Sequence, residues 1–137
     1  AETLLKCLDA LLQNSLPTAV EQPSEGITYA RKLMKAEAKV DWREEAGTIE
    51  RRIRAFNPWP VAWCEIGGER TRIWSAERLN LDHHEPPGTV LAASKEGIDI
   101  ACGKQALRIT GLQRPGGRPI SAENYLNARP VAPGPIN

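Results

Sequence analysis

Five short runs with the character of β-strands follow one another through the second half of the chain, and they constrain the fold more than any other feature. They occupy residues 61–66, 70–79, 88–93, 98–102 and 106–113. Gly67-Gly68 separates the first two runs and can supply the positive φ angles of a tight hairpin turn. Five strands need closure to hide their edges, and an OB-like barrel is one known arrangement. The sequence therefore predicts a mainly β fold, a small OB-like barrel of five to six strands with flanking helices.

An amphipathic helix is predicted at the start of the chain, where one face carries Leu4, Leu8, Leu11 and Leu12. A polar stretch from Pro17 to Thr28, containing Pro, Ser and Gly, follows as a linker. The leucine stripe either docks onto the barrel or belongs to another domain, and we favour the second reading. We therefore assign residues 1–28 to the end of a preceding domain and a linker, and residues 29–137 to the barrel domain.

Two further helices flank the predicted strands. Ala46, Ile49, Ile53 and Phe56 recur at spacings of three and four, and Asn57-Pro58 ends that helix. A last helix begins at Ser121, which is a suitable N-cap. We predict that Trp59 is a packing anchor in the core, and that the proline-rich tail from residue 130 is mobile.

The charge is distributed unevenly, although the net charge is only +1. Residues 31–60 carry eight basic and five acidic side chains, and residues 101–137 carry five basic side chains and one acidic. Residues 1–30 and 61–100 are each acidic. If folding brings the two basic segments together, they form a surface suited to a polyanion.

Catalytic and metal-binding patterns are sparse in this sequence. The three cysteines are far apart and form no C-x-x-C pair, which favours small packing residues in a reducing cytoplasm. Asp82, His83, His84 and Glu85 are adjacent in a loop that we expect to be solvated rather than metal-binding. The glycine pairs lack the lysine of a phosphate-binding loop, and no apolar run is long enough to cross a membrane. We expect no catalytic residue, metal or cofactor in this chain.

Three stretches carry a resemblance to a known family. They are T-Y-A-R-K-L-M-K-A-E-A-K-V-D-W at 28–42, I-R-A-F-N-P-W-P at 53–60, and P-G-T-V-L at 87–91 followed by A-C-G and A-L-R-I-T. Together they resemble the C-terminal domain of methionyl-tRNA formyltransferases, with the preceding linker and the last helix of the catalytic domain. Sugar and folate formyltransferases share part of this pattern but usually disturb the R-A-F-N-P-W-P run. The tail departs from the family, since relatives often have an aromatic residue before the final Pro-Gly.

The resemblance implies a division of labour. In that family an N-terminal Rossmann-like domain binds 10-formyltetrahydrofolate as formyl donor and carries the catalytic asparagine, histidine and aspartate. The barrel domain and linker help to hold the initiator methionyl-tRNA. We therefore expect a cytoplasmic parent enzyme, a missing catalytic domain as partner, and no formyl transfer by this segment alone.

The candidate tRNA-binding residues are basic side chains of the lead-in segment and of the last strand and loop. They are Arg31, Lys32, Lys35, Lys39, Arg108, Arg114 and Arg118. The motif position supports Lys32 and Lys35 most. Contacts of this kind neutralise phosphates and position the RNA without reading bases. Two alternatives stay open: an accessory barrel of a sugar or folate formyltransferase, and a purely structural interdomain module.

Overall fold

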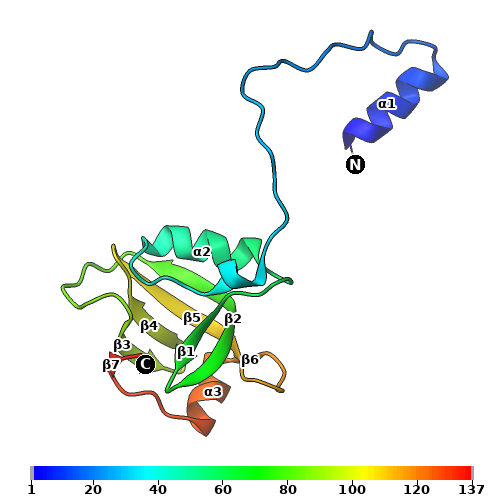
Figure 1. The fold of residues 1–137 in the computed structure, drawn as a ribbon. Helices are drawn as coiled ribbons and strands as arrows, with labels where there is room; N and C mark the ends of the chain where they lie inside the picture. Colours follow the sequence, from blue (N-terminus) through cyan, green and yellow to red (C-terminus); the bar gives the residue numbers. More distant parts are fainter. Residues whose placement is uncertain (1, 137) are drawn as a thin grey trace. The chain divides into compact units, whose positions relative to one another are not determined.

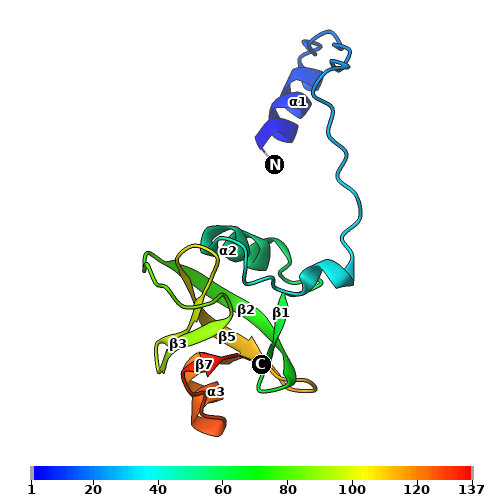
Figure 2. The ribbon, with the colours of Figure 1, turned by 60° about the vertical axis from the view of Figure 1, so that its left-hand side comes forward.

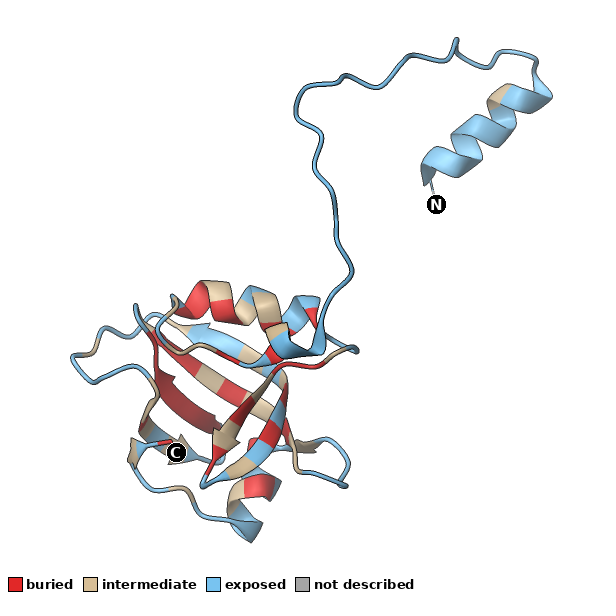
Figure 3. Cartoon of the chain, viewed as in Figure 1, coloured by how far each residue is buried: buried red, intermediate tan, exposed pale blue. Residues whose placement is uncertain are grey.

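The computed structural model describes residues 2–136, which divide into one unit ending at residue 31 and a second beginning at residue 32. The first unit contains helix α1 (Glu2–Leu12), which is labelled in Figure 1. None of its residues is buried, and Leu12 is 83% exposed. Figure 3 accordingly shows α1 almost entirely in the exposed colour. The predicted helix is confirmed, and its leucine face has no apolar partner within its own unit.

The second unit opens with two helical elements. A 3-10 turn, η1 (Lys35–Ala38), precedes α2 (Ala46–Ala55). The predicted apolar stripe of α2 faces the core, where Ala46, Ile49 and Ile53 are each at most 1% exposed. Periodicity in the sequence therefore identified both the helix and its buried face.

A single antiparallel sheet forms the body of the second unit. Its neighbouring strands run in the order β1-β2-β5-β4-β3-β7, and β6 pairs with β5. The strands are β1 (Trp63–Ile66), β2 (Glu69–Leu79), β3 (Thr89–Ser94), β4 (Gly97–Ala101), β5 (Ala106–Gln113), β6 (Ile120–Ser121) and β7 (Gly134–Pro135). The sheet curls around the core as a half-barrel, so the predicted fold class is confirmed. Two strands of two residues each, β6 and β7, raise the strand number to seven.

The C-terminal tail is part of the barrel, and the prediction that it is mobile is wrong. β7 pairs with β3, and Figure 2 shows the two strands side by side. Ile136 donates its N–H to the carbonyl oxygen of Gly88 at 3.0 Å and accepts from the N–H of Gly67 at 3.1 Å. The side chain of Ile136 is 5% exposed. Proline excludes helix here but permits extended backbone, so the tail can join the β3 edge to the β1–β2 turn.

The core is aliphatic and lies between the sheet and helices α2 and α3 (Ala122–Ala128) (Figure 3). Its most buried large side chains are Ile49, Ile53, Ile73, Ile98, Ile100, Leu107, Ile109, Leu112 and Tyr125. The predicted N-cap of α3 is confirmed, since Ser121 Oγ accepts the N–H of Asn124 at 3.2 Å. The prediction for Trp59 is wrong: Trp59 is 49% exposed, whereas the nearby Phe56 is 6% exposed and belongs to the core.

Candidate nucleic-acid interface

The lead-in segment brings its lysines to the edge of β1. Lys39 forms a parallel bridge with Trp63, and Val40 donates its N–H to the carbonyl oxygen of Trp63 at 2.9 Å. Lys39 Nζ then lies 5.3 Å from the centre of the Trp63 ring and 3.4 Å from Glu65 Oε1. Lys35 begins the 3-10 turn that leads into this pairing. The backbone therefore holds Lys39 beside β1, and Lys35 lies one turn earlier in the chain.

The β1–β2 hairpin turns two arginines outward. Its register pairs Trp63 with Arg72 and Glu65 with Arg70, whereas the intervening pair, Cys64 with Thr71, is buried. Since side chains alternate across a strand, Arg70 and Arg72 share the solvent face. Both arginines are exposed, and the Arg70 guanidinium carbon lies 4.1 Å from the centre of the Trp63 ring. Trp63 thus orders Arg70 through a cation–π contact.

A hollow of about 250 Å³ lies where this hairpin meets the end of β5. It is lined by Arg70, Arg72, Gln113, Arg114, Pro115 and Gly116. Register explains the meeting, because Arg72 pairs with Gln113 across β2 and β5. A neighbouring hollow is lined by Arg114, Arg118 and the glycines between them. Arg118 is exposed and makes no ion pair among residues 2–136.

These contacts define a continuous surface that we call the basic strip: Lys35, Lys39, Arg70, Arg72, Arg114 and Arg118. Three carboxylates lie along it, and one of them is Glu37, in the same 3-10 turn as Lys35. Glu65 pairs with Lys39, and Glu69 accepts from Arg114 Nε at 3.1 Å and from Arg129 Nη1 at 2.9 Å. The hydrogen bond from Arg114 lowers the pKa of Glu69 and raises the pKa of Arg114 itself. Cations outnumber carboxylates on the strip, which gives it a positive potential.

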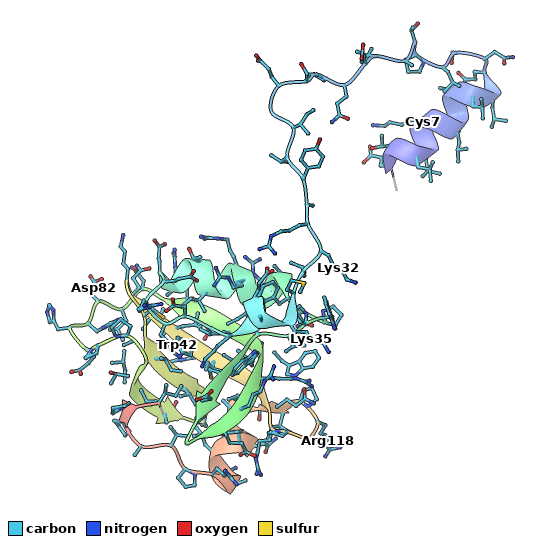
Figure 4. All side chains as sticks on the ribbon, viewed as in Figure 1. Cys7, Lys32, Lys35, Trp42, Asp82 and Arg118 are labelled. Atoms are coloured by element: carbon cyan, nitrogen blue, oxygen red, sulfur yellow. The ribbon has the colours of Figure 1, made fainter. Side chains whose placement is uncertain are left out.

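The candidate residues named from the sequence divide into three groups. Lys35, Lys39, Arg114 and Arg118 belong to the basic strip, and Figure 4 shows Lys32, Lys35 and Arg118 toward the same edge of the view. Arg31, the last residue of the first unit, and Lys32, the first residue of the second, precede the strip in the chain. Arg108 forms the third group, because it pairs with Asp99 and Glu96. Arg70 and Arg72 were missing from the candidates, although the polar alternation of R-T-R-I after a Gly-Gly turn could have identified them.

Arg108 is held by two carboxylates of the β4 side of the sheet. Its Nε and Nη2 donate to Asp99 at 2.7 and 2.8 Å, and Nη1 lies 3.2 Å from Glu96. The hydrogen bonds to Asp99 raise the pKa of Arg108, and the Asp99 carboxylate is nearly buried, at 7% exposed. Arg108 lies five residues before Gln113 on β5, or roughly 16 Å along a strand. Its charge is therefore neutralised locally.

The other titratable groups offer little for catalysis. No group of three or more His, Cys, Asp and Glu side chains within residues 2–136 could hold a metal ion. Asp82, His84 and Glu85 are exposed, as expected for a solvated loop. His83 is half-buried, and its Nε2 lies 2.7 Å from the carbonyl oxygen of Gln105. Cys64 and Cys102 are buried, and burial raises the pKa of each thiol to about 12. In the part of the chain that the structure describes, no helix is long and apolar enough to span a bilayer.

Comparisons with known proteins identify similar sequences. The chain is 54% identical over 129 residues to the methionyl-tRNA formyltransferase of Xanthomonas axonopodis pv. citri, covering 94% of this chain and 42% of that protein. The methionyl-tRNA formyltransferase of Stenotrophomonas maltophilia (strain R551-3) gives the same identity and the same coverage. The chain thus spans less than half the length of these relatives.

Solved structures show the same fold. HypX from Aquifex aeolicus superposes with a TM-score of 0.70 at 21% identity, covering 98% of this chain and 24% of that one. A HypX structure in complex with tetrahydrofolic acid gives a TM-score of 0.69, also at 21% identity. Residues 32–130 match the family described as formyl transferase, C-terminal domain. The chain therefore belongs to the formyl transferase C-terminal domain family.

Proposed function

We propose that this chain is the tRNA-binding C-terminal part of a methionyl-tRNA formyltransferase, and that the basic strip is its RNA contact surface. The observation that carries the proposal is the continuity of the strip from Lys39 to Arg118 across β1, β2 and the end of β5. The identity of 54% to methionyl-tRNA formyltransferases supports the choice of RNA.

The strip acts by electrostatics and position. Each phosphate that a lysine or arginine neutralises releases counterions, and the logarithm of the binding constant then falls by roughly 0.9 per log unit of salt. Such contacts fix the orientation of the RNA without reading its sequence. Lys35 is the first residue of the strip along the chain, and Lys32 and Arg31 precede it in the lead-in segment. Arg108 adds little potential, since Asp99 and Glu96 neutralise it.

The remaining steps belong to the parent protein. Residues 1–28 are the end of its catalytic domain and the linker, and the exposed leucine face of α1 packs against that domain. The N-terminal domain takes the formyl group from 10-formyltetrahydrofolate and transfers it to the amino group of initiator methionyl-tRNA in the cytoplasm. The barrel holds the tRNA so that its aminoacyl end reaches that active site. Proximity of this kind converts a bimolecular encounter into an effectively intramolecular one.

A salt-titrated binding assay with initiator tRNA tests the proposal on the full 137-residue chain. Lys32→Glu combined with Lys35→Glu should weaken binding at least about tenfold at low salt and flatten the salt dependence. A matched control changes two exposed lysines outside the strip, Lys95→Glu with Lys104→Glu, and should have a much smaller effect. The proposal fails if the unaltered chain binds tRNA no better than a neutral control domain, or if the two double variants behave alike.

A further inference from the structure

The hollow at the junction of β2 and β5 gathers three guanidinium groups on one exposed surface. It is lined by Arg70, Arg72 and Arg114, whose guanidinium groups have different partners. Arg70 is stacked on the Trp63 ring, and Arg114 is held by Glu69. The side chain of Arg72 is exposed and makes no hydrogen bond or ion pair with residues 2–136. The site therefore has one uncommitted guanidinium flanked by two that are already ordered.

The loop that forms the other wall is fixed by a side-chain relay. Trp74 Nε1 donates to Gln113 Oε1 at 2.8 Å, and Gln113 Nε2 donates to the carbonyl oxygen of Gly117 at 2.6 Å. Gly116 has a φ of +70°, and a Cβ built there would meet no atom within 4 Å. A ligand can therefore approach the Gly116 backbone closely, at a wall that Gln113 holds in place.

On the basis of the RNA-binding function proposed above, we propose that this hollow seats one backbone phosphodiester of the RNA. Arg72 supplies the planar fork that grips the phosphate oxygens, and Arg70 adds a second positive charge. Arg114, whose charge is largely balanced by Glu69, lines the hollow as an ordered wall. A guanidinium suits this task because its parallel N–H donors match two oxygens of a phosphate. Trp63 and Glu69 restrict Arg70 and Arg114 before the ligand arrives, which reduces the side-chain entropy lost on binding.

The openness of the site argues for a phosphate carried on a polymer. Arg70, Arg72, Pro115 and Gly116 are all exposed, so the hollow offers charge and donors but is open to solvent. Small-molecule sites are usually concave and mostly apolar, and they bury most of their ligand. An internal phosphodiester needs only a local anion seat, since the chain on either side continues over the protein surface. Lys39, beside Trp63, and Arg118, in the neighbouring hollow, offer further positive charge to the adjoining phosphates.

The decisive variant is Arg72→Gln, because it removes an exposed side chain that holds nothing else in the fold. On the full chain we expect its affinity for initiator tRNA to fall roughly threefold to tenfold, and the salt slope to decrease by about 0.9. The matched control is Arg78→Gln, an exposed arginine on the same strand that makes no ion pair among the described residues. It should leave the slope unchanged. Both variants should melt at the same temperature as the unaltered chain.

A second measurement does not depend on tRNA. Dimethyl phosphate, a minimal phosphodiester, is titrated while the arginine Nε–H signals are followed by NMR. The Arg70, Arg72 and Arg114 signals should shift first and together, and Arg72→Gln should abolish the shift at the other two. The phosphate seat is refuted if Arg78 responds as strongly, or if an acidic peptide shifts these signals and dimethyl phosphate does not.

The two proposals can fail separately. If the unaltered chain does not bind tRNA, the RNA-binding function is lost. If tRNA binds and the Lys32/Lys35 double variant weakens it, but Arg72→Gln matches Arg78→Gln in affinity and slope, only the phosphate seat is wrong.

Discussion

Gly103 lies directly against the backbone of Arg43, so close that a Cβ on Gly103 would be 1.9 Å from the Arg43 carbonyl oxygen. The Gly103 N–H donates to the carbonyl oxygens of both Trp42 and Glu44, each at 2.9 Å. The glycine therefore joins the segment before α2 to the turn between β4 and β5. This contact holds the lead-in segment, and with it the start of the basic strip, against the barrel.

Replacing Gly103 with alanine should force these two backbones apart. Overpacking of this kind typically costs 1–3 kcal/mol, and we expect Gly103→Ala to lower the free energy of unfolding by about 3 kcal/mol. Urea denaturation of the full chain measures the change. Gly117→Ala is the control, because its Cβ would come no closer than 3.4 Å to another atom, and it should cost less than about 1 kcal/mol. Equal losses for the two variants would contradict this reading.

The buried tail residue Ile136 leads to a second stability prediction. Truncating a buried isoleucine to alanine typically costs about 2–5 kcal/mol, so Ile136→Ala should lower the unfolding free energy by an amount in this range. It should also speed hydrogen exchange at the Gly67 amide, which donates to the Ile136 carbonyl. Ile27→Ala is the matched control, since Ile27 is 47% exposed in the first unit. An unchanged Gly67 exchange rate would mean that the tail does not close the barrel.

The tail illustrates where reasoning from the sequence stops. Local periodicity predicted α2 and its buried stripe, and the Gly67-Gly68 turn predicted the first hairpin. Ile136, in contrast, is held in place by backbone hydrogen bonds to Gly88 and Gly67. These residues lie 48 and 69 positions earlier in the chain. No short-range pattern encodes a pairing at that separation, and three prolines in nine residues resembled a disordered end.

The sequence also could not show which charged side chains of the candidate site are neutralised. Net charge by segment pointed to residues 101–137, yet Arg108 and Arg114 find carboxylates at Asp99 and Glu69 on neighbouring strands. The segment that holds Arg70 and Arg72 is acidic overall, so a segmental count hid them. Whether a charged side chain is neutralised depends on which residues face it on the neighbouring strand. That register can be read only once the pairing of the strands is known.

Thiol reactivity should separate the three cysteines. Cys64 and Cys102 are buried with pKa values near 12, whereas Cys7 is exposed on α1. Because the thiolate is the reactive form, a disulfide reagent at mildly alkaline pH should label one thiol in the native chain and three in denaturant. Cys7→Ser should remove the rapid reaction entirely. Rapid labelling of a second thiol in the native chain would contradict the burial of the other two.

Acid should weaken the fold through Asp41. The side-chain and backbone hydrogen bonds from Arg43 lower the pKa of Asp41 from 3.8 to about 2. A carboxyl group with a lowered pKa stabilises the folded state above its unfolded pKa, and that contribution is lost as the pH falls from about 4 to about 2. Carboxyl ¹³C NMR should report the low pKa directly. Arg43→Gln should raise it partway toward 3.8, and Arg51→Gln should leave it unchanged.

Arg108 offers a test that separates structural from RNA-binding arginines. Asp99 is 7% exposed and depends on Arg108 for two short hydrogen bonds, so Arg108→Gln leaves a nearly buried carboxylate without its cation. An unsatisfied buried acceptor costs about 1–3 kcal/mol, and we expect a loss of that order in the free energy of unfolding. Adding Asp99→Asn should recover part of it, which a double-mutant cycle measures. Affinity for tRNA should change far less than in Arg72→Gln. If Arg108→Gln instead weakens tRNA binding strongly and leaves stability intact, the RNA surface extends along β5 and the limits drawn here for the basic strip are wrong.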